Sequence, residues 1–200
     1  MTVSTIGVAD ADTPDKYLHT NQRTISSTAR EDQYVLQGES AYPTYSVATS
    51  QNADTANVHI LQLMGDGTNY TRIKRISILP YFASVESEFA VEVRRLSSAG
   101  TGGGALTPSP FDSADTYAGG AMALPSSKGT EGALLLRASM HITDTTAAVA
   151  AGSYTWEQAP GAKPIIIGPA TSSGVAIKAV NTISGAVCAV NVEFITTTYL

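Results

Sequence analysis

The sequence predicts an all-β protein: an antiparallel, jelly-roll-like β-sandwich that carries an extended N-terminal arm. Three observations predict this fold. Short segments of alternating apolar and polar residues recur from about residue 58, turn-forming Gly, Pro, Asn and Asp separate them, and no segment keeps a helical period over a useful length. At 200 residues the chain can hold one such domain with an appendage. We place the arm at residues 1–55 and the sandwich at residues 56–200.

Residues 1–55 differ in composition from the rest of the chain. They are rich in Ser, Thr, Asp and Gln and show no sustained apolar period, which predicts an extended or irregular segment. A purely disordered tail would contain fewer aromatic residues, so Tyr34, Tyr42 and Tyr45 are candidates for contacts with a partner or a neighbouring subunit. The alternative is an irregular cap over the chain's own sandwich.

The first strong strands are expected at residues 58–64 and 70–79, joined by a glycine-containing hairpin loop. In the second strand the apolar phase slips after Ile73. A β-bulge near Lys74 and Arg75 would restore a single apolar face, because a bulge adds one residue to one strand of a pair.

The third strand, residues 87–95, alternates strictly and ends in Arg94-Arg95. A long connection follows, in which a glycine run permits positive φ while Pro108 and Pro110 hold the backbone extended. Its glycines fit neither the dinucleotide nor the phosphate-loop spacing. We therefore predict a shaped surface feature presented to a neighbour, and a crossover of this length favours a jelly-roll or Greek-key connection.

Five further strands are expected, at residues 133–142, 153–157, 163–168, 174–180 and 186–197. In the first of them Leu134, Leu136 and Met140 are expected to face the core. In the last, Cys188 alternates with apolar residues, so this single cysteine is predicted to be buried and unreactive.

The sequence offers no recognisable catalytic, cofactor or metal site, which predicts a protein that is not an enzyme. His19, His59 and His141 lie far apart in the sequence, although the last two could meet on adjacent strands. Asp112 and Asp115 are expected to cap turns. A Gly-x-Ser-x-Gly nucleophile elbow does not occur.

Charge and hydropathy argue against some classes of partner. The net charge is −5 and only 14% of residues are charged, which argues against a nucleic-acid binder. The sequence also contains no apolar run long enough to span a membrane and no basic start typical of a signal peptide. The basic residues concentrate on two strands that could be neighbours, as a solvated face or as a strip that docks on an acidic protein: Arg72, Lys74, Arg75, Arg94 and Arg95.

Several segments form a recognisable succession of strand ends, loops and strands. They are Val93-Arg94-Arg95, Thr101-Gly102-Gly103, Leu106-Thr107-Pro108-Ser109-Pro110, Asp112, Pro169, Gly174-Val175-Ala176-Ile177 and Val190-Asn191-Val192-Glu193. In these segments residues 57–200 resemble the small all-β virion proteins of tailed bacteriophages. The resemblance implies a virion structural protein, above all a capsid decoration or cement protein that binds the major capsid protein outside the shell, often as a homotrimer. It implies synthesis in the host cytoplasm, a place on the capsid surface and no cofactor.

Two alternatives remain open. The first is another virion component of the same style, such as a head fibre, neck or tail protein. The second is a carbohydrate-binding module, because β-sandwiches commonly present aromatic side chains to sugars. The candidates for such contacts are Tyr81, Phe82, Tyr117, Tyr154 and Trp156.

Overall fold

The computed structural model describes residues 3–7, 17–25, 28–33, 42–142 and 152–198, with side chains described from residue 42 onward except that of Phe82. The chain divides into two compact units, Met1–Ala41 and Tyr42–Leu200. No helix in these described ranges is long and apolar enough to cross a membrane.

The first unit contains a three-stranded antiparallel sheet in the order β1-β2-β3. Its strands are β1 (Val3–Gly7), β2 (Tyr17–Ile25) and β3 (Thr28–Gln33). The prediction of an extended or irregular segment missed these strands, because their polar sequences lack the apolar alternation that marks a half-buried strand. Tyr34 lies outside the described residues.

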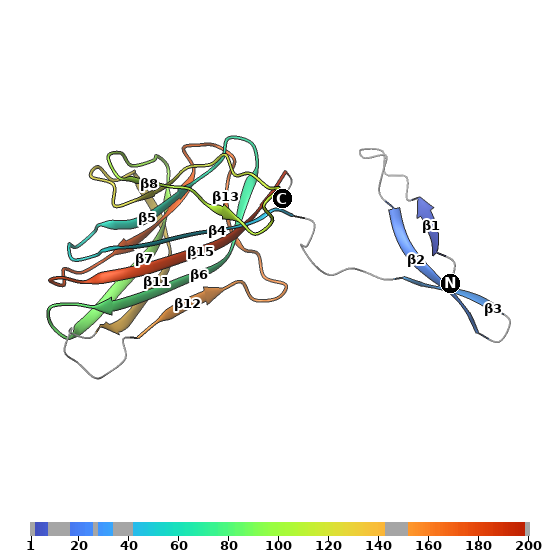
Figure 1. Ribbon diagram of the computed structural model, residues 1–200, viewed down its shortest axis with the longest axis horizontal. Coiled ribbons are helices and arrows are strands. Elements are labelled where there is room, and N and C mark those ends of the chain that lie inside the picture. The colour runs from blue at the N-terminus through green and yellow to red at the C-terminus, as the bar shows by residue number, and fades with distance from the viewer. Residues whose placement is uncertain (1–2, 8–16, 26–27, 34–41, 143–151, 199–200) are drawn as a thin grey trace. The chain divides into compact units, whose positions relative to one another are not determined.

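The second unit is an antiparallel β-sandwich, which confirms the predicted fold class (Figure 1). One sheet, here called the β14 sheet, has the order β11-β7-β14-β5-β10-β8; the other, the β15 sheet, has the order β12-β6-β15-β4-β9, with β13 also paired to β6. The strands are β4 (Thr44–Asn52), β5 (His59–Met64), β6 (Tyr70–Phe82), β7 (Ser87–Leu96), β8 (Gly104–Leu106), β9 (Ser109–Pro110), β10 (Ala121–Ala123), β11 (Glu131–Ile142), β12 (Tyr154–Glu157), β13 (Ile165–Ile167), β14 (Gly174–Ala179) and β15 (Val187–Thr197).

Successive strands repeatedly change sheet. β4, β5, β6 and β7 alternate between the β15 sheet and the β14 sheet, and β14 is followed by β15 in the opposite sheet. Connections that cross between two packed sheets are those of a jelly-roll-like sandwich rather than of a meander. In Figure 1, β4, β15, β6 and β12 follow one another across one sheet, which is the surface that matters below.

The core lies between the two inner faces and forms one principal apolar cluster. Alternate residues of β7 and β15 supply fully buried side chains such as Phe89, Val91, Val192 and Phe194. Each side chain of this size stabilises the fold by about 1.5–3 kcal/mol when it leaves water. Cys188 belongs to this cluster, and burial raises the pKa of its thiol to about 12, as expected for an unreactive core cysteine.

The predicted bulge in β6 is confirmed. Glu193 of β15 lies opposite Arg75, but the next residue, Phe194, lies opposite Ile73, so Lys74 is the extra residue. The bulge returns Ile73 to the core face that Ile76 also occupies, and each of these isoleucines is only 1% exposed.

The sandwich begins earlier than the predicted boundary at residue 55, because β4 pairs along its whole length with β15. Tyr45 was expected to contact a partner, yet it is 2% exposed and belongs to the core. Its hydroxyl donates to the carbonyl oxygen of Thr116 at 2.8 Å, and its ring stacks on Phe194 with centroids 5.5 Å apart. The small polar residues on the outer face of β4 make its composition similar to that of the preceding residues, so this strand was assigned to the N-terminal arm.

The inward assignment of Leu134 is wrong, because this side chain is 46% exposed. The pairing of β11 with β7 shifts register between Glu131 and Leu134 and again between Leu134 and Leu136. A strict alternation counted back from Met140 no longer holds at Leu134, because Leu134 lies between these two register shifts. Met140, beyond both shifts, is buried as expected.

Candidate interaction surface

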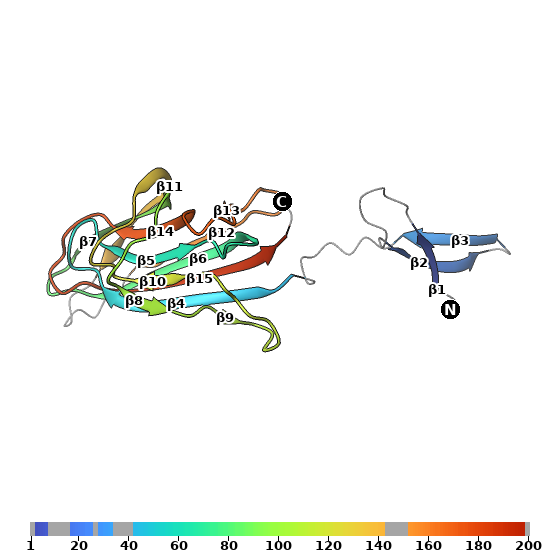
Figure 2. The same ribbon diagram turned by 90° about the horizontal axis from the view of Figure 1, so that it is seen from above.

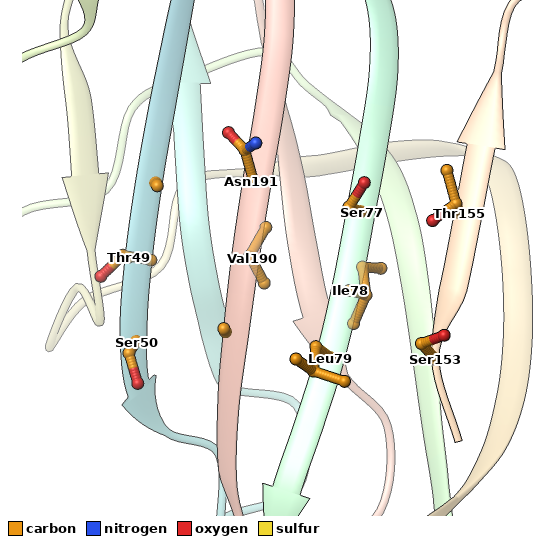
Figure 3. Close-up of a pocket in the computed structure, with 11 residues that line it drawn as sticks. Thr49, Ser50, Ser77, Ile78, Leu79, Ser153, Thr155, Val190 and Asn191 are labelled. Carbon is orange, nitrogen blue, oxygen red and sulfur yellow. The ribbon is translucent and has the colours of Figure 1, made fainter. Parts of the chain in front are cut away.

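The outer face of the β15 sheet is hollowed by a groove of about 650 Å³, shown in Figure 3. Residues of β4, β15 and β6 line it, together with residues at the start of β12. The lining residues are Ala48, Thr49, Ser50, Ser77, Ile78, Leu79, Ser153, Thr155, Ala189, Val190 and Asn191. None of these side chains carries a charge, and most are small.

Strand register explains why the groove forms there. Side chains directly opposite one another on neighbouring strands form rows across a sheet. One row contains Ala48, Asn191, Ser77 and Thr155, and the next contains Ser50, Ala189 and Leu79. Because Ala and Ser are short, these rows leave a trough that crosses the strands.

Different side chains flank the two sides of the trough. On one side Arg75 and Glu193 form an ion pair, with side chains 44% and 20% exposed, and Glu157 lies opposite Arg75. On the other side the Tyr81 hydroxyl donates to Ser50 Oγ at 2.6 Å. The floor between these sides is uncharged, and the side chain of Leu79 lies in it at 45% exposure.

The outer face of the β14 sheet carries a network of charged residues instead. Arg94 Nε lies 2.6 Å from Glu92 Oε2, and Lys178 Nζ lies 2.9 Å from Glu131 Oε2 and 3.7 Å from Glu92 Oε2. Arg137 reaches Glu92 Oε1 at 3.4 Å. This face is therefore charged but internally paired.

The pKa values of the two glutamates reflect this pairing. Burial alone would raise the pKa of Glu131, but hydrogen bonds from Lys178 and His59 lower it to about 2. The hydrogen bond from Arg94 is the largest influence on Glu92 and holds the pKa of that carboxyl below its ordinary value. Both carboxylates are thus ionised in the folded protein at neutral pH.

The histidines do not come together. His59 lies on β5 and His141 on β11, and β14 and β7 separate these strands in the sheet. His59 Nε2 is 3.0 Å from Glu131 Oε1, whereas His141 Nε2 is 2.9 Å from Glu86 Oε1. The side chain of His19 is outside the described part of the chain. Among described residues, no group of three or more His, Cys, Asp or Glu side chains is placed to hold a metal ion.

The predicted basic strip is wrong as a single surface. β6 and β7 are consecutive in sequence but belong to opposite sheets, so their basic residues do not line neighbouring strands. Each group also has contacts within the chain. Arg75 pairs with Glu193, Arg94 with Glu92, Lys74 Nζ donates to Gln158 Oε1 at 2.6 Å, Arg95 donates to the carbonyl oxygen of Ile166, and half-buried Arg72 lies opposite Ile195.

The proline segment folds back on its own sheet. Pro108 is buried, and Pro110 lies in β9 opposite Tyr45 of β4, at the edge of the β15 sheet (Figure 2). The expectation that both prolines face a neighbour is therefore wrong for Pro108, whose side chain is buried within the chain. Pro110 lies in a short edge strand, which uses the extended backbone that proline favours. Phe111, which follows them, is 64% exposed.

The turn chemistry of this connection matches the prediction in part. Gly102 has a φ of +72°. Asp112 Oδ1 accepts from the backbone N–H of Ala114 at 3.0 Å, so this aspartate caps a turn. Asp115 takes part in the same turn through its own backbone N–H, which donates to the carbonyl oxygen of Asp112.

Most aromatic residues proposed for sugar contacts point away from the groove. Tyr154 and Trp156 pack against the core, while Thr155 between them faces outward. The Tyr117 hydroxyl donates to the carbonyl oxygen of Met64 at 3.0 Å, and its ring packs on the core. Tyr81 is 37% exposed, and the side chain of Phe82 lies outside the described part of the chain.

Sequence reasoning missed the groove. A signal existed in the outward positions of three strands, where small uncharged residues recur as Ser46, Ala48 and Ser50, as Ala189 and Asn191, and as Ser77. Only the pairing of β4 with β15 and of β15 with β6 brings these short runs together on one face.

No protein-family model, curated protein or solved structure matches this chain.

Proposed function

We propose that this protein is a non-enzymatic structural protein of a bacteriophage virion, and specifically a decoration or cement protein that docks on the outside of the capsid shell through the groove face of the β15 sheet. The observation that carries the proposal is the absence of charge among the residues that line the groove. Burying an unpaired charge is costly, and the cores of protein interfaces are depleted of charged residues. This face can be covered by a partner without that cost.

The surroundings of the groove suit the rim of such an interface. The four strands that it crosses span about 14 Å, since neighbouring strands lie about 4.8 Å apart. A stable interface buries about 800 Å² on each partner, so the groove would form the centre of the contact and its polar surroundings the rim. The Arg75–Glu193 ion pair on one side of the groove and the Tyr81 hydroxyl on the other fit that position.

The composition of the N-terminal unit favours a second contact, between this unit and the proposed assembly. Its strand β3 has the sequence TAREDQ, in which Ala29 is the only apolar residue. A small sheet without an apolar face to bury is only marginally stable by itself and gains stability when it packs against another surface. Contacts from both units would add avidity to the docked state. The proposed partners are the major capsid protein and further copies of this chain, with a homotrimer favoured, on the capsid surface.

Binding to purified capsids that lack the protein tests this proposal. The wild-type chain should co-sediment with the capsids and saturate. Ala189→Arg, which puts a charge on the groove floor, should weaken binding by about tenfold or more, equivalent to about 1.4 kcal/mol. Ala133→Arg, at an exposed position of β11 in the other sheet, is the matched control and should bind as the wild type does. Equal binding by both variants would refute docking through the groove.

The contribution of the N-terminal unit needs a separate deletion. The deletion should remove residues 1–41 and stop before β4, which belongs to the sandwich. We expect lower occupancy of the capsid by a chain that still folds. Unchanged occupancy would remove the role of the N-terminal unit while leaving the role of the groove intact.

Two other functions would use the same surface. A head fibre, neck or tail protein would also dock through an uncharged face, and imaging of labelled particles separates these locations. A carbohydrate-binding module is favoured by the hydroxyl groups of Ser50, Ser77 and Thr155 in the groove, but Tyr154 and Trp156 pack inward. A glycan array without hits would remove that function.

A further inference from the structure

Residues 97–130 connect β7 to β11 and supply β8 and β10 at the other edge of the β14 sheet and β9 in the β15 sheet. The two ends of this connection pair with each other in a closed base. The backbone N–H of Ser97 donates to the carbonyl oxygen of Thr130 at 3.0 Å. Thr101 and Ser127 exchange two backbone hydrogen bonds, of 2.8 and 3.1 Å. We call these two paired segments, residues 97–101 and 127–131, the stem.

Two neighbouring side chains of β5 hold the two sides of the stem. Gln62 Oε1 accepts from the backbone N–H of Gly100, on the outgoing side, at 2.9 Å. His59 Nε2 lies 3.0 Å from Glu131 Oε1, on the returning side. His59 and Gln62 bond to each other at 2.6 Å between Nδ1 and Nε2, and they are 0% and 1% exposed.

The approach of the stem to β5 is close. A Cβ atom at Gly100 would lie 2.7 Å from the carbonyl oxygen of Ser127, 2.8 Å from Pro125 Cβ and 2.9 Å from Gln62 Nε2. Glycine at this position therefore allows the amide of Gln62 to reach the backbone of the stem.

The hydrogen-bond partners fix where the protons lie. Because Gln62 Oε1 accepts from Gly100, its Nε2 faces His59 Nδ1 and donates to it. His59 Nδ1 is then an unprotonated acceptor, and its Nε2 carries the proton that is donated to the Glu131 carboxylate. All the bonds are satisfied with a neutral imidazole.

We propose that His59 is an acid-sensitive latch for the stem, which holds both of its sides when neutral and releases the outgoing side when protonated. A proton on Nδ1 meets the Gln62 amide nitrogen, which is also a donor. To accept from the protonated ring, the amide must turn over, and its NH₂ group then faces the N–H of Gly100. The bond to Gly100 is lost, while the charged ring keeps Glu131.

The charged groups around His59 set where the latch opens. Glu131 of β11 favours the protonated ring, whereas Lys178 of β14 and Lys128, just before β11, oppose it. Glu92 and Arg94 of β7 act on His59 indirectly. Glu92 pairs with Lys178, and Arg94 pairs with Glu131. Burial is the largest influence and lowers the pKa of His59 below its ordinary value of 6.5. The latch is closed at neutral pH and opens in more acidic solution.

Amide hydrogen exchange at Gly100, followed by NMR together with the titration of the His59 ring, tests the latch. As the pH is lowered from 7 until the His59 ring is protonated, the protection of the Gly100 amide, corrected for its intrinsic exchange rate, should fall about tenfold or more. The fall should follow the protonation of His59, while the amides of β15 stay protected. Constant protection at Gly100 while His59 titrates would overturn the proposal.

Two variants sharpen the test. Gln62→Glu supplies a carboxylate that accepts from both Gly100 and a protonated ring, so the Gly100 amide should stay protected and His59 should titrate at higher pH. His141→Gln removes the exposed histidine that pairs with Glu86 and should leave the response unchanged. The wild-type titration decides the matter alone if Gln62→Glu does not fold.

Discussion

The two outer faces of the sandwich differ more than the two inner faces do. Both inner faces are apolar and meet in one core. Outside, the β14 sheet carries Glu92, Arg94, Lys178 and Glu131 in a paired network, whereas the β15 sheet carries a groove with no charged lining residue. The charged face uses its side chains to hold the chain's own segments, and in our proposal the uncharged face is the one that a partner covers. If so, the two faces divide stability and binding between them.

The largest effect should come from breaking the charged face. Glu131→Gln removes the negative charge that faces Lys178, which is only 8% exposed, and weakens the bond to His59. Breaking a buried charge pair is costly, so we expect the free energy of unfolding to fall by about 3 kcal/mol. Urea unfolding at neutral pH measures it, and a loss below about 1 kcal/mol would mean that this face is not structurally important.

The next effect is a loss of stability in acid that originates in the same face. The pKa of Glu131 in the folded protein is about 2, below the ordinary 4.5, so its contribution is complete above pH 4.5 and is lost as the pH falls toward 2. His59, whose pKa is also lowered, adds a loss that begins as the pH falls below 6.5. We expect a total loss of about 2–3 kcal/mol between neutral pH and pH 3.

Urea unfolding across this pH range measures the acid loss. The Glu131→Gln chain should lose less stability in acid than the wild type, because it lacks the carboxylate with the strongly lowered pKa. Parallel curves for the two proteins would place the acid sensitivity elsewhere.

Pro108→Ala gives an intermediate effect and tests the edge of the uncharged face. Pro108 is buried beside β9, so the substitution removes packing and frees the unfolded chain. We expect a loss of about 1 kcal/mol in the free energy of unfolding. Capsid binding, measured under conditions in which both the variant and the wild type are folded, should stay unchanged. Weaker binding without a loss of stability would restore the interpretation that this proline contacts a partner.

Glu193→Gln should have the smallest effect and is the counterpart of Glu131→Gln on the other sheet. Its partner Arg75 is 44% exposed, and ion pairs in water contribute little. We expect a change below about 1 kcal/mol in urea unfolding. If the two glutamine variants lost equal stability, the contrast between the faces would be wrong.

Much of the sandwich could be predicted from the sequence, because a strand with one buried face has alternating apolar and polar residues. The alternation of Cys188, Val190, Val192 and Phe194 identified β15. A break in the apolar alternation of β6 after Ile73 identified the bulge at Lys74. β4 was missed since its outer residues are small and polar, and Leu134 was misassigned because β11 carries two irregularities.

The candidate surface could not be predicted in the same way. Sequence periodicity tells which face of a strand is buried but not which strands are neighbours. For that reason the basic residues of β6 and β7 were grouped although the strands lie in opposite sheets. The groove depends on register between β4, β15 and β6, which are far apart in the chain.

A density map of the protein bound to the capsid that we propose as its partner tests the division between the two faces most directly. The account predicts that the face formed by β4, β15, β6 and β12 lies against the shell, with the groove filled by the partner. It also predicts that the charged face of β11, β7 and β14 remains in solvent. A map with the charged face against the shell and the groove open to solvent would contradict the central claim.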